Sequence, residues 1–430
     1  MAYIEETRAP VVPSLGEATL VWLKIGLLSF GGPTAQIALM HKEIVEERAW
    51  LSEQQYLNAL SFCMLLPGPE AMQLATYAGW RLHGTIGGLI AGLLFVLPGA
   101  LVIMALATIY SVFGDVPLVD ALFYGIKAAV LVIVVDALLR VSKKSLSTRL
   151  HWTIAGVAFV GIFFLSVPYP LIVAFAALLG WFIGVEKAIT VEDKPASVSF
   201  GSTLSTGAIG LAVWAAPFIL LAVFGANDIL LQVGVFFSQL AVVTFGGAYA
   251  VLAYMAQDVV VDFGWLTAGE MVDALGLAET TPGPLILVTQ FVGFLAGFQE
   301  GGLLLGFLAA TVALWVTFAP CFLWIFAGAP YIDWISEQPR LRSTLKAITA
   351  AVVGVILNLS LWFALHFLFS EVQQERLGLV TLWKPNLASI EWLALALFGL
   401  SGFMAFWLHW GIIRVLAIAS VTGCALHLLL

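Results

Sequence analysis

The chain has 430 residues, of which 61% are hydrophobic and 10% are charged, whereas a soluble domain carries about 25% charged residues. This composition excludes a water-soluble globular protein. The net charge of -8, with 18 Lys and Arg residues that form no basic stripe, excludes nucleic acid as a partner.

The long apolar runs of the chain decide its fold class. Lipid satisfies no backbone hydrogen bonds, so a chain that crosses a bilayer must form helices or closed barrels. The runs are as long as helices and lack the alternation of barrel strands. We therefore expect an all-α, polytopic integral membrane protein that is surrounded by the lipid bilayer.

Residues 1–14 form an N-terminal tail without the basic and apolar regions of a cleavable signal peptide, so we expect the first spanning helix to direct insertion. The first transporter repeat covers 15–186. It should contain a first span, a broken segment, two long spans and two shorter apolar segments. The expected bounds are 15–35 for the first span, 54–82 for the broken segment, and 151–167 and 169–186 for the shorter pair.

Residues 187–228 form a linker that begins with polar residues and carries one extra apolar helix at 206–226. The second transporter repeat covers 229–430 and has the same order of elements. Its expected bounds are 229–250 for the first span, 269–297 for the broken segment, and 388–408 and 410–430 for the final pair.

The two halves are internal repeats of one another. A shift of 215 positions aligns Phe30-Gly31-Gly32 with Phe245-Gly246-Gly247, and the same shift aligns Pro67-Gly68-Pro69 with Pro282-Gly283-Pro284. A tryptophan between the two motifs also stays in register. Self-similarity at one period over half the chain indicates duplicated structural units.

The extra helix between the repeats predicts that the second repeat is inverted in the membrane. Basic loop residues favour the cytoplasmic side. The loop 140–149 holds four bases and no acid, whereas its counterpart at 370–386 is mixed in charge. We expect the first loop inside and the second outside, which agrees with inverted repeats whose broken helices meet at a substrate site.

The recurring Gly and Pro motifs are the strongest candidates for that site. Helices must break at them, and the N-terminal ends of half-helices suit an anion. The alternative is that these residues only kink tightly packed helices, but recurrence in both halves favours a site. The candidate substrate-binding residues are Gly31, Gly32, Pro33, Pro67, Gly68, Pro69, Gly246, Gly247, Pro282, Gly283 and Pro284.

Charged residues near these motifs could complete the site. Lys127 and Lys346 are equivalent after a small insertion and could bind a dianion, although each could instead extend to the membrane surface. Glu70 follows the first Pro-Gly-Pro and Glu279 precedes the second, so both are candidates for proton coupling. Asp136 is a third candidate, with a salt bridge to a neighbouring helix as the alternative.

Uncharged polar residues could also contribute hydrogen bonds, although packing between helices is the better explanation for each alone. They are Gln36, Gln73, Gln239, Gln257, Thr280, Thr281, Gln290 and Asn358. The sequence lacks the phosphate-binding Gly-x-x-x-x-Gly-Lys-Ser/Thr loop and the His-Glu-x-x-His motif. Its three cysteines lack disulfide or metal spacing. We therefore expect no metal, no cofactor and no enzymatic activity.

The chain resembles the two-domain members of the chromate ion transporter family over nearly its full length. The motifs that carry the resemblance are Ser29-Phe30-Gly31-Gly32-Pro33, Leu66-Pro67-Gly68-Pro69-Glu70-Ala71, Gly125-Ile126-Lys127, Thr244-Phe245-Gly246-Gly247 and Glu279-Thr280-Thr281-Pro282-Gly283-Pro284. Ala248 replaces Pro33 in the second half, so the two half-sites need not be equal.

The resemblance implies a multi-pass exporter in the inner (cytoplasmic) membrane that removes chromate, is driven by the proton gradient and confers chromate resistance. Transport of sulfate or another tetrahedral oxyanion is the alternative within this class. A passive anion channel is a further alternative, and a membrane enzyme would need a catalytic constellation that the sequence does not show. The oligomeric state stays open, a homodimer included.

Overall fold

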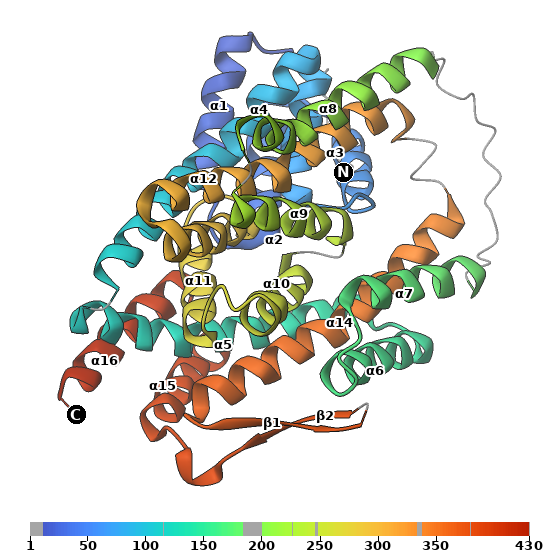
Figure 1. Cartoon of the computed structure of the whole chain (residues 1–430). Coiled ribbons are helices and arrows are strands. Elements are labelled where there is room, and N and C mark those ends of the chain that lie inside the picture. Colours follow the sequence, from blue (N-terminus) through green and yellow to red (C-terminus); the bar gives the residue numbers. More distant parts are fainter. Residues whose placement is uncertain are drawn as a thin grey trace, which may run out of the picture.

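A computed structural model describes residues 12–114, 116–183, 200–225, 227–245, 248–332, 338–378 and 380–429. Helices dominate it (Figure 1), which confirms the all-α membrane fold. Within the described residues, five helices are long and apolar enough to cross a membrane: Glu70–Phe113, Ala121–Ser145, Gly201–Phe224, Leu285–Tyr331 and Pro339–Leu368. The chain is a multi-pass membrane protein.

The first half contains seven α-helices and one π-helical turn in the described part of the chain. They are α1 (Leu15–Leu28), α2 (Gly32–His41), η1 (Lys42–Glu46), α3 (Glu53–Cys63), α4 (Glu70–Phe113), α5 (Pro117–Ser145), α6 (Arg149–Phe163) and α7 (Tyr169–Ile183). Helix α8 (Phe200–Phe224) then connects the halves, at the place where the sequence predicts an extra helix.

The second half repeats this order and adds a small hairpin. Its elements are α9 (Asp228–Val243), α10 (Ala248–Gln257), η2 (Asp258–Asp262), α11 (Ala268–Thr280), η3 (Leu285–Leu287), α12 (Val288–Gly328), η4 (Ala329–Tyr331), α14 (Pro339–Leu368), β1 (Val372–Leu377), β2 (Val380–Pro385), η5 (Leu387–Ser389), α15 (Trp392–Gly402), η6 (Phe403–Trp407) and α16 (Ile412–Leu429). The antiparallel β1–β2 pair is the feature that the sequence analysis did not predict.

Equivalent local signals produce equivalent elements in the two halves. Ser52 caps α3 and Thr267 caps α11, each in a reciprocal capping box with the residue three positions later. These two caps are related by the same shift of 215 positions as the sequence motifs. A π-helical turn follows α2 in one half and α10 in the other.

Helices α4 and α12 each fold back on themselves near one end. The backbone leaves the helical region at His83 and Gly84 in α4, and at Gly301 and Gly302 in α12. Small residues let the two arms of each hairpin touch: an added Cβ at Gly79 would lie 2.3 Å from the Gly87 carbonyl oxygen. Each half therefore contains a tight helical hairpin whose shorter arm begins at Pro-Gly-Pro.

The helices gather in two lobes that do not coincide with the two sequence repeats (Figure 1). Helices α1, α4, α8, α9 and α12 pack together in one lobe, and α5, α6, α7, α14, α15 and α16 in the other. In the second lobe α5 packs on α15 and α16 from the other half, while α14 packs on α6 and α7. Each repeat thus contributes to both lobes, and neither can complete a lobe alone.

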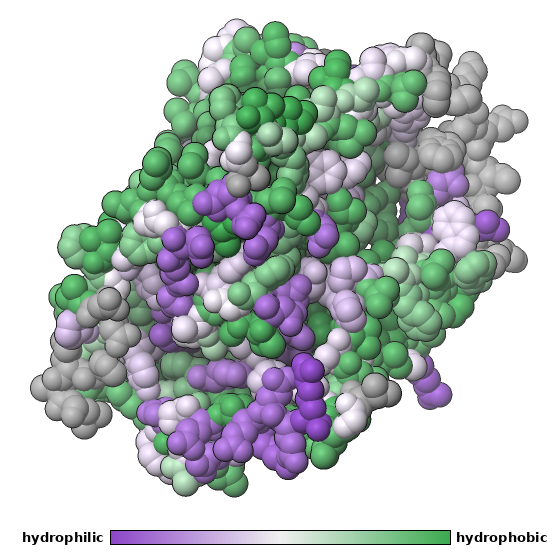
Figure 2. Space-filling model, in the orientation of Figure 1, coloured by the Kyte–Doolittle hydropathy of each residue, from purple (hydrophilic) through white to green (hydrophobic). Residues whose placement is uncertain are grey.

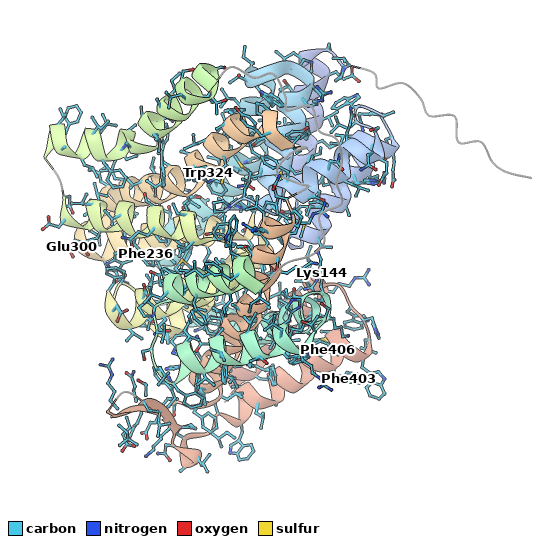
Figure 3. All side chains as sticks on the ribbon, turned by 90° about the vertical axis from the view of Figure 1, so that its right-hand side faces the viewer. Lys144, Phe236, Glu300, Trp324, Phe403 and Phe406 are labelled. Atoms are coloured by element: carbon cyan, nitrogen blue, oxygen red, sulfur yellow. The ribbon has the colours of Figure 1, made fainter. Side chains whose placement is uncertain are left out.

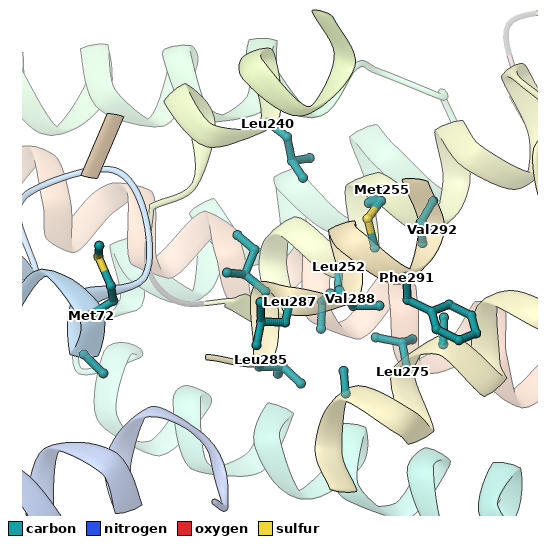
Figure 4. Close-up of a cluster of buried hydrophobic side chains, with 14 of the residues drawn as sticks. Met72, Leu240, Leu252, Met255, Leu275, Leu285, Leu287, Val288, Phe291 and Val292 are labelled. Carbon is teal, nitrogen blue, oxygen red and sulfur yellow. The ribbon is translucent and has the colours of Figure 1, made fainter. Parts of the chain in front are cut away.

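Apolar side chains fill the interior and also cover much of the surface. Figure 4 shows a buried cluster around the second broken helix that includes Leu252, Met255, Leu285 and Phe291, each at most 3% exposed. On the surface in Figure 2, hydrophilic residues gather over the β1–β2 hairpin, and hydrophobic residues cover most of the α4–α12 lobe. The hydrophobic surface is suited to contact with lipid, and the hairpin forms a polar end of the molecule.

Replacing Gly79 by Ala should destabilise the protein, because the added methyl group would collide with the backbone of the other hairpin arm. We expect a loss of about 1–3 kcal/mol, measured as a lower melting temperature in detergent. Gly156→Ala on α6 is the matched control, since a Cβ there meets nothing within 4 Å. Equal melting temperatures for the two variants would contradict the close hairpin packing.

Candidate functional site

The two Pro-Gly-Pro loops meet the ends of the first spans across the halves. The Gly68 N–H donates to the Thr244 carbonyl oxygen at 2.8 Å, and the Gly283 N–H donates to the Ser29 carbonyl oxygen, also at 2.8 Å. Donors and acceptors are repeat equivalents, so the two bonds form a symmetric pair. The Gln36 amide also donates to the Ser29 and Gly283 oxygens at 3.2 and 2.7 Å. Each broken helix is therefore held by the other half.

Glycine is required at the centre of both loops. Gly68 has a φ of +117° and Gly283 a φ of +91°, which side chains rarely adopt. Next to the first loop, the Gln73 amide donates to the Pro67 carbonyl oxygen at 2.7 Å. The Gln73 Oε1 is buried without a hydrogen-bond partner among the described residues. A polar region therefore lies at the loops, deep within an apolar protein.

The ends of the first spans have the expected breaks. Helix α1 ends at Leu28, and α2 begins at Gly32, with Pro33 in its first turn. Gly31 and Gly32 have φ of +85° and +77°, so the chain turns sharply between the two helices. The equivalent Gly246 and Gly247 lie outside the described residues.

Both candidate carboxylates lie beside the broken backbone. Glu70 begins α4 directly after Pro69, and Glu279 is 6% exposed and accepts a 2.6 Å hydrogen bond from the Tyr249 hydroxyl. Arg140 lies close enough to act electrostatically on Glu279, and Lys144 on Glu70. Figure 3 shows Lys144 at the end of α5, at the edge between the two lobes. Two bases in the last turns of α5 are thus within electrostatic range of the carboxylates at the breaks.

Asp136 has a different environment from the other two carboxylates. Its Oδ2 pairs with Arg140 at 2.9 Å, one turn further along α5, and 38% of its side chain is exposed. The expected alternative, a salt bridge to a neighbouring helix, is replaced by a pair within the same helix. Asp136 therefore orients Arg140, which in turn acts on Glu279.

Lys127 is held by an ion pair between the halves. Its Nζ lies 3.2 Å from Asp273 Oδ2, and the side chains are 17% and 4% exposed. The Tyr110 hydroxyl donates to the same oxygen at 2.8 Å. Asp273 lies about two helical turns before the end of α11 at Thr280, so Lys127 lies beside α11 and away from the Pro-Gly-Pro loop. The equivalent Lys346 lies exposed near the start of α14.

Several residues of this region were not predicted as part of the site: Tyr249, Arg140, Lys144 and Asp273. The basic segment 140–149 was expected as a loop, but the structure places Arg140, Lys143 and Lys144 in the last turns of α5 and Arg149 at the start of α6. It served only to predict orientation, although Arg140 and Lys144 also act on the carboxylates. Asp273 had a usable signal, because it aligns with Asn58 in the first half. Because the first half has the neutral Asn58 at this position, the negative charge of Asp273 suggests a nearby positive charge that only the second-half position must compensate.

Two helices broken by Pro-Gly-Pro, each held by the inverted counterpart, define a multi-pass membrane protein with the architecture of secondary transporters. The sequence pattern of the Chromate transporter family matches residues 16–181 and 231–424, once in each half. The chain belongs to the chromate transporter family.

Relatives match over most of the chain and confirm the resemblance. The chain is 32% identical to the probable chromate transport protein of Synechococcus elongatus, over 80% of this chain and 83% of that protein. It is 30% identical to the chromate transport protein of Cupriavidus metallidurans, over 80% and 81%, and 34% identical to that of Pseudomonas aeruginosa, over 78% and 77%. No solved structure matches the chain.

The Lys127–Asp273 pair should behave as a structural ion pair. Lys127→Met leaves the carboxylate of Asp273 buried and uncompensated, at a cost of about 3–5 kcal/mol. We expect the double variant with Asp273→Leu to lose much less than the sum of the two single variants, as measured by thermal unfolding in detergent. Lys42→Met is the control, because Lys42 pairs with Glu47 on the surface and should change stability by about 0–1 kcal/mol. Additive losses would exclude the ion pair.

Proposed function

We propose that this protein is a secondary active transporter in the inner (cytoplasmic) membrane that exports chromate, and that export is driven by the proton gradient and gives chromate resistance. The observation that carries the proposal is the reciprocal junction of the two Pro-Gly-Pro breaks. Membership of the chromate transporter family and relatives named as chromate transport proteins support the substrate.

The breaks suit a tetrahedral dianion. Helix α4 begins immediately after Pro69, and η3 with α12 begins immediately after Pro284. Each N-terminus leaves backbone N–H groups without helical partners and carries the positive end of the helix dipole. Each half contributes one such end, held by the first span of the other half, so the two breaks supply hydrogen-bond donors and partial positive charge without a metal ion.

The charges around the breaks support a direction for transport. Arg140 and Lys144 in the last turns of α5 act on Glu279 and Glu70, and Lys143 and Arg149 lie in the same basic segment at the junction of α5 and α6. Since basic loops favour the cytoplasm, this end faces the cytoplasm in the proposed orientation. Positive charges at this end raise the local concentration of an anionic substrate. They would therefore favour binding of chromate from the cytoplasm.

The proton gradient can act on this transporter in two ways. The membrane potential alone favours outward movement of a dianion by about 5 kcal/mol per 100 mV, without any proton site. The pH difference requires a titratable group beside the anion, and Glu70 and Glu279 hold that position. Because protons enter the cell as chromate leaves, the proposal requires that a proton and the dianion are bound in alternate halves of the transport cycle.

Sulfate transport is the alternative that the same observation favours. The helix ends would recognise charge and tetrahedral shape, which sulfate shares with chromate. A passive anion channel would use the same junction, but its flux would not respond to the pH difference.

The test is accumulation of radiolabelled chromate in inverted inner-membrane vesicles, with the membrane potential and the pH difference imposed separately. Coupled export predicts accumulation that each gradient increases and that excess sulfate reduces. Vesicles without the protein are the control. Accumulation that is absent, or that ignores the pH difference, would reject coupled chromate export.

Glu279→Gln should separate the two driving forces. Glutamine keeps the hydrogen bond to Tyr249 but cannot exchange a proton, so the part of the flux that depends on the pH difference should be lost. The part driven by the membrane potential should remain. Glu300→Gln is the matched control, because Glu300 is an exposed carboxylate at the hairpin turn before Gly301 (Figure 3). A pH response that survives in Glu279→Gln would remove this residue from proton coupling.

A further inference from the structure

A polar cavity lies away from the Pro-Gly-Pro junction, beneath the β1–β2 hairpin. Its volume is about 200 Å³, and its walls come from the ends of α6 and α10, from η2, α14 and both hairpin strands. The hairpin follows α14, at the opposite end of that helix from its start at Pro339. In the proposed orientation the cavity therefore opens on the outer side of the membrane.

Polar side chains line this cavity, and one buried donor among them lacks a partner among the described residues. Trp362 and Asn358 of α14 are each 6% exposed, and the Trp362 Nε1 has no hydrogen-bond partner among the described residues. Gln257, Gln374 and Arg376 also line it. A buried N–H without an acceptor costs about 1–3 kcal/mol, so a ligand with several acceptor oxygens would satisfy what the protein leaves unpaired.

The charged residues of the hairpin strand β1 lie on different faces of the strand. Gln374 and Arg376 alternate with Gln373 and Glu375 along β1, and successive strand residues point to opposite faces. Arg376 therefore faces the cavity, whereas Glu375 pairs with Lys384 of β2.

One acid, Asp262 of η2, also lines the cavity. Its charge and that of Arg376 cancel formally, so neutral donors must provide most of the recognition. Such a cavity should hold a dianion more weakly than a purely basic one.

Helix α10 connects the cavity with the proposed transport site. Tyr249 in its first turn donates to Glu279 beside the second break, and Gln257 at its last position lines the cavity. Their separation of eight positions corresponds to about 12 Å along a helix. The cavity therefore lies two to three helical turns from the residue that contacts Glu279.

The inverted repeat allows the residues of this cavity to be compared with their equivalents at the cytoplasmic end of the first half. The repeat shifts place Lys42 at the position of Gln257 and Lys143 at the position of Trp362. Lys42 pairs with Glu47, the repeat equivalent of Asp262, so Lys143 is the lysine that distinguishes the cytoplasmic end. The affinity for a dianion should decrease from the inner to the outer end.

We propose that this cavity binds a tetrahedral oxyanion, sulfate or chromate, as the outer release site of the transport route. The inference rests on the proposed function for its orientation and its ligand class. Asn358, Trp362 and Arg376 provide the donors, and the compensating charge of Asp262 keeps the affinity low enough for release.

The experiment uses right-side-out membrane vesicles loaded with radiolabelled chromate and measures the external sulfate concentration that halves efflux. Arg376→Gln and Asn358→Leu should each raise this concentration about tenfold, because each removes a donor to the anion. Gln373→Leu is the matched control, since it changes the other face of the same strand and should behave as wild type. Variants that match Gln373→Leu would overturn the proposal.

Failure of the proposed function would look different. Wild-type vesicles that do not export chromate would reject the exporter, and titration calorimetry of the purified protein with sulfate would then test the cavity independently. Sulfate binding that weakens in Trp362→Phe, which keeps an aromatic ring without the N–H, supports the site. Equal binding by wild type and Trp362→Phe, or no binding by either, removes it.

Discussion

The rest of the structure depends on how the backbone is satisfied where two membrane helices break. In lipid an unpaired N–H has no water to bind, and each Pro-Gly-Pro loop solves this by donating from Gly68 or Gly283 to the first span of the other half. The junction can form only when both repeats are present. The packing of α5 on α15 and α16, and of α14 on α6 and α7, also requires both repeats. The two repeats therefore form one interlocked unit.

The sequence predicted the helical class, the repeat and the positions of the breaks, because Gly and Pro act locally and a repeat period is visible without a structure. It could not predict the lobes, which depend on close approaches between distant helices, such as Gly125 against Ala419 and Gly354 against Ala155. The hairpin was missed because its alternation is short and lies between long apolar runs. The glycines and prolines of the candidate site stay predictions, and the structure adds contacts that only three dimensions show, such as the ion pair of Lys127 with Asp273.

The charges of the site are distributed differently from a simple anion cage. Lys127, the most obvious cation in the sequence, is neutralised by Asp273, and the groups directly at the breaks are the acids Glu70 and Glu279. Positive potential at the junction must then come from helix ends and from Arg140 and Lys144. An arrangement of this kind offers an anion several weak donors instead of a tight cage of lysines.

An inverted repeat with identical halves would present the same chemistry to both sides of the membrane. The gradients determine the direction of net transport, but the differences between the halves determine how tightly each side binds. Among these differences, the lysines at positions 42 and 143 correspond to Gln257 and Trp362, and Asn58 corresponds to Asp273. Each change lowers the positive charge available to an anion in the second half. The two halves therefore share the broken-helix architecture, while differences at such positions make their charges unequal.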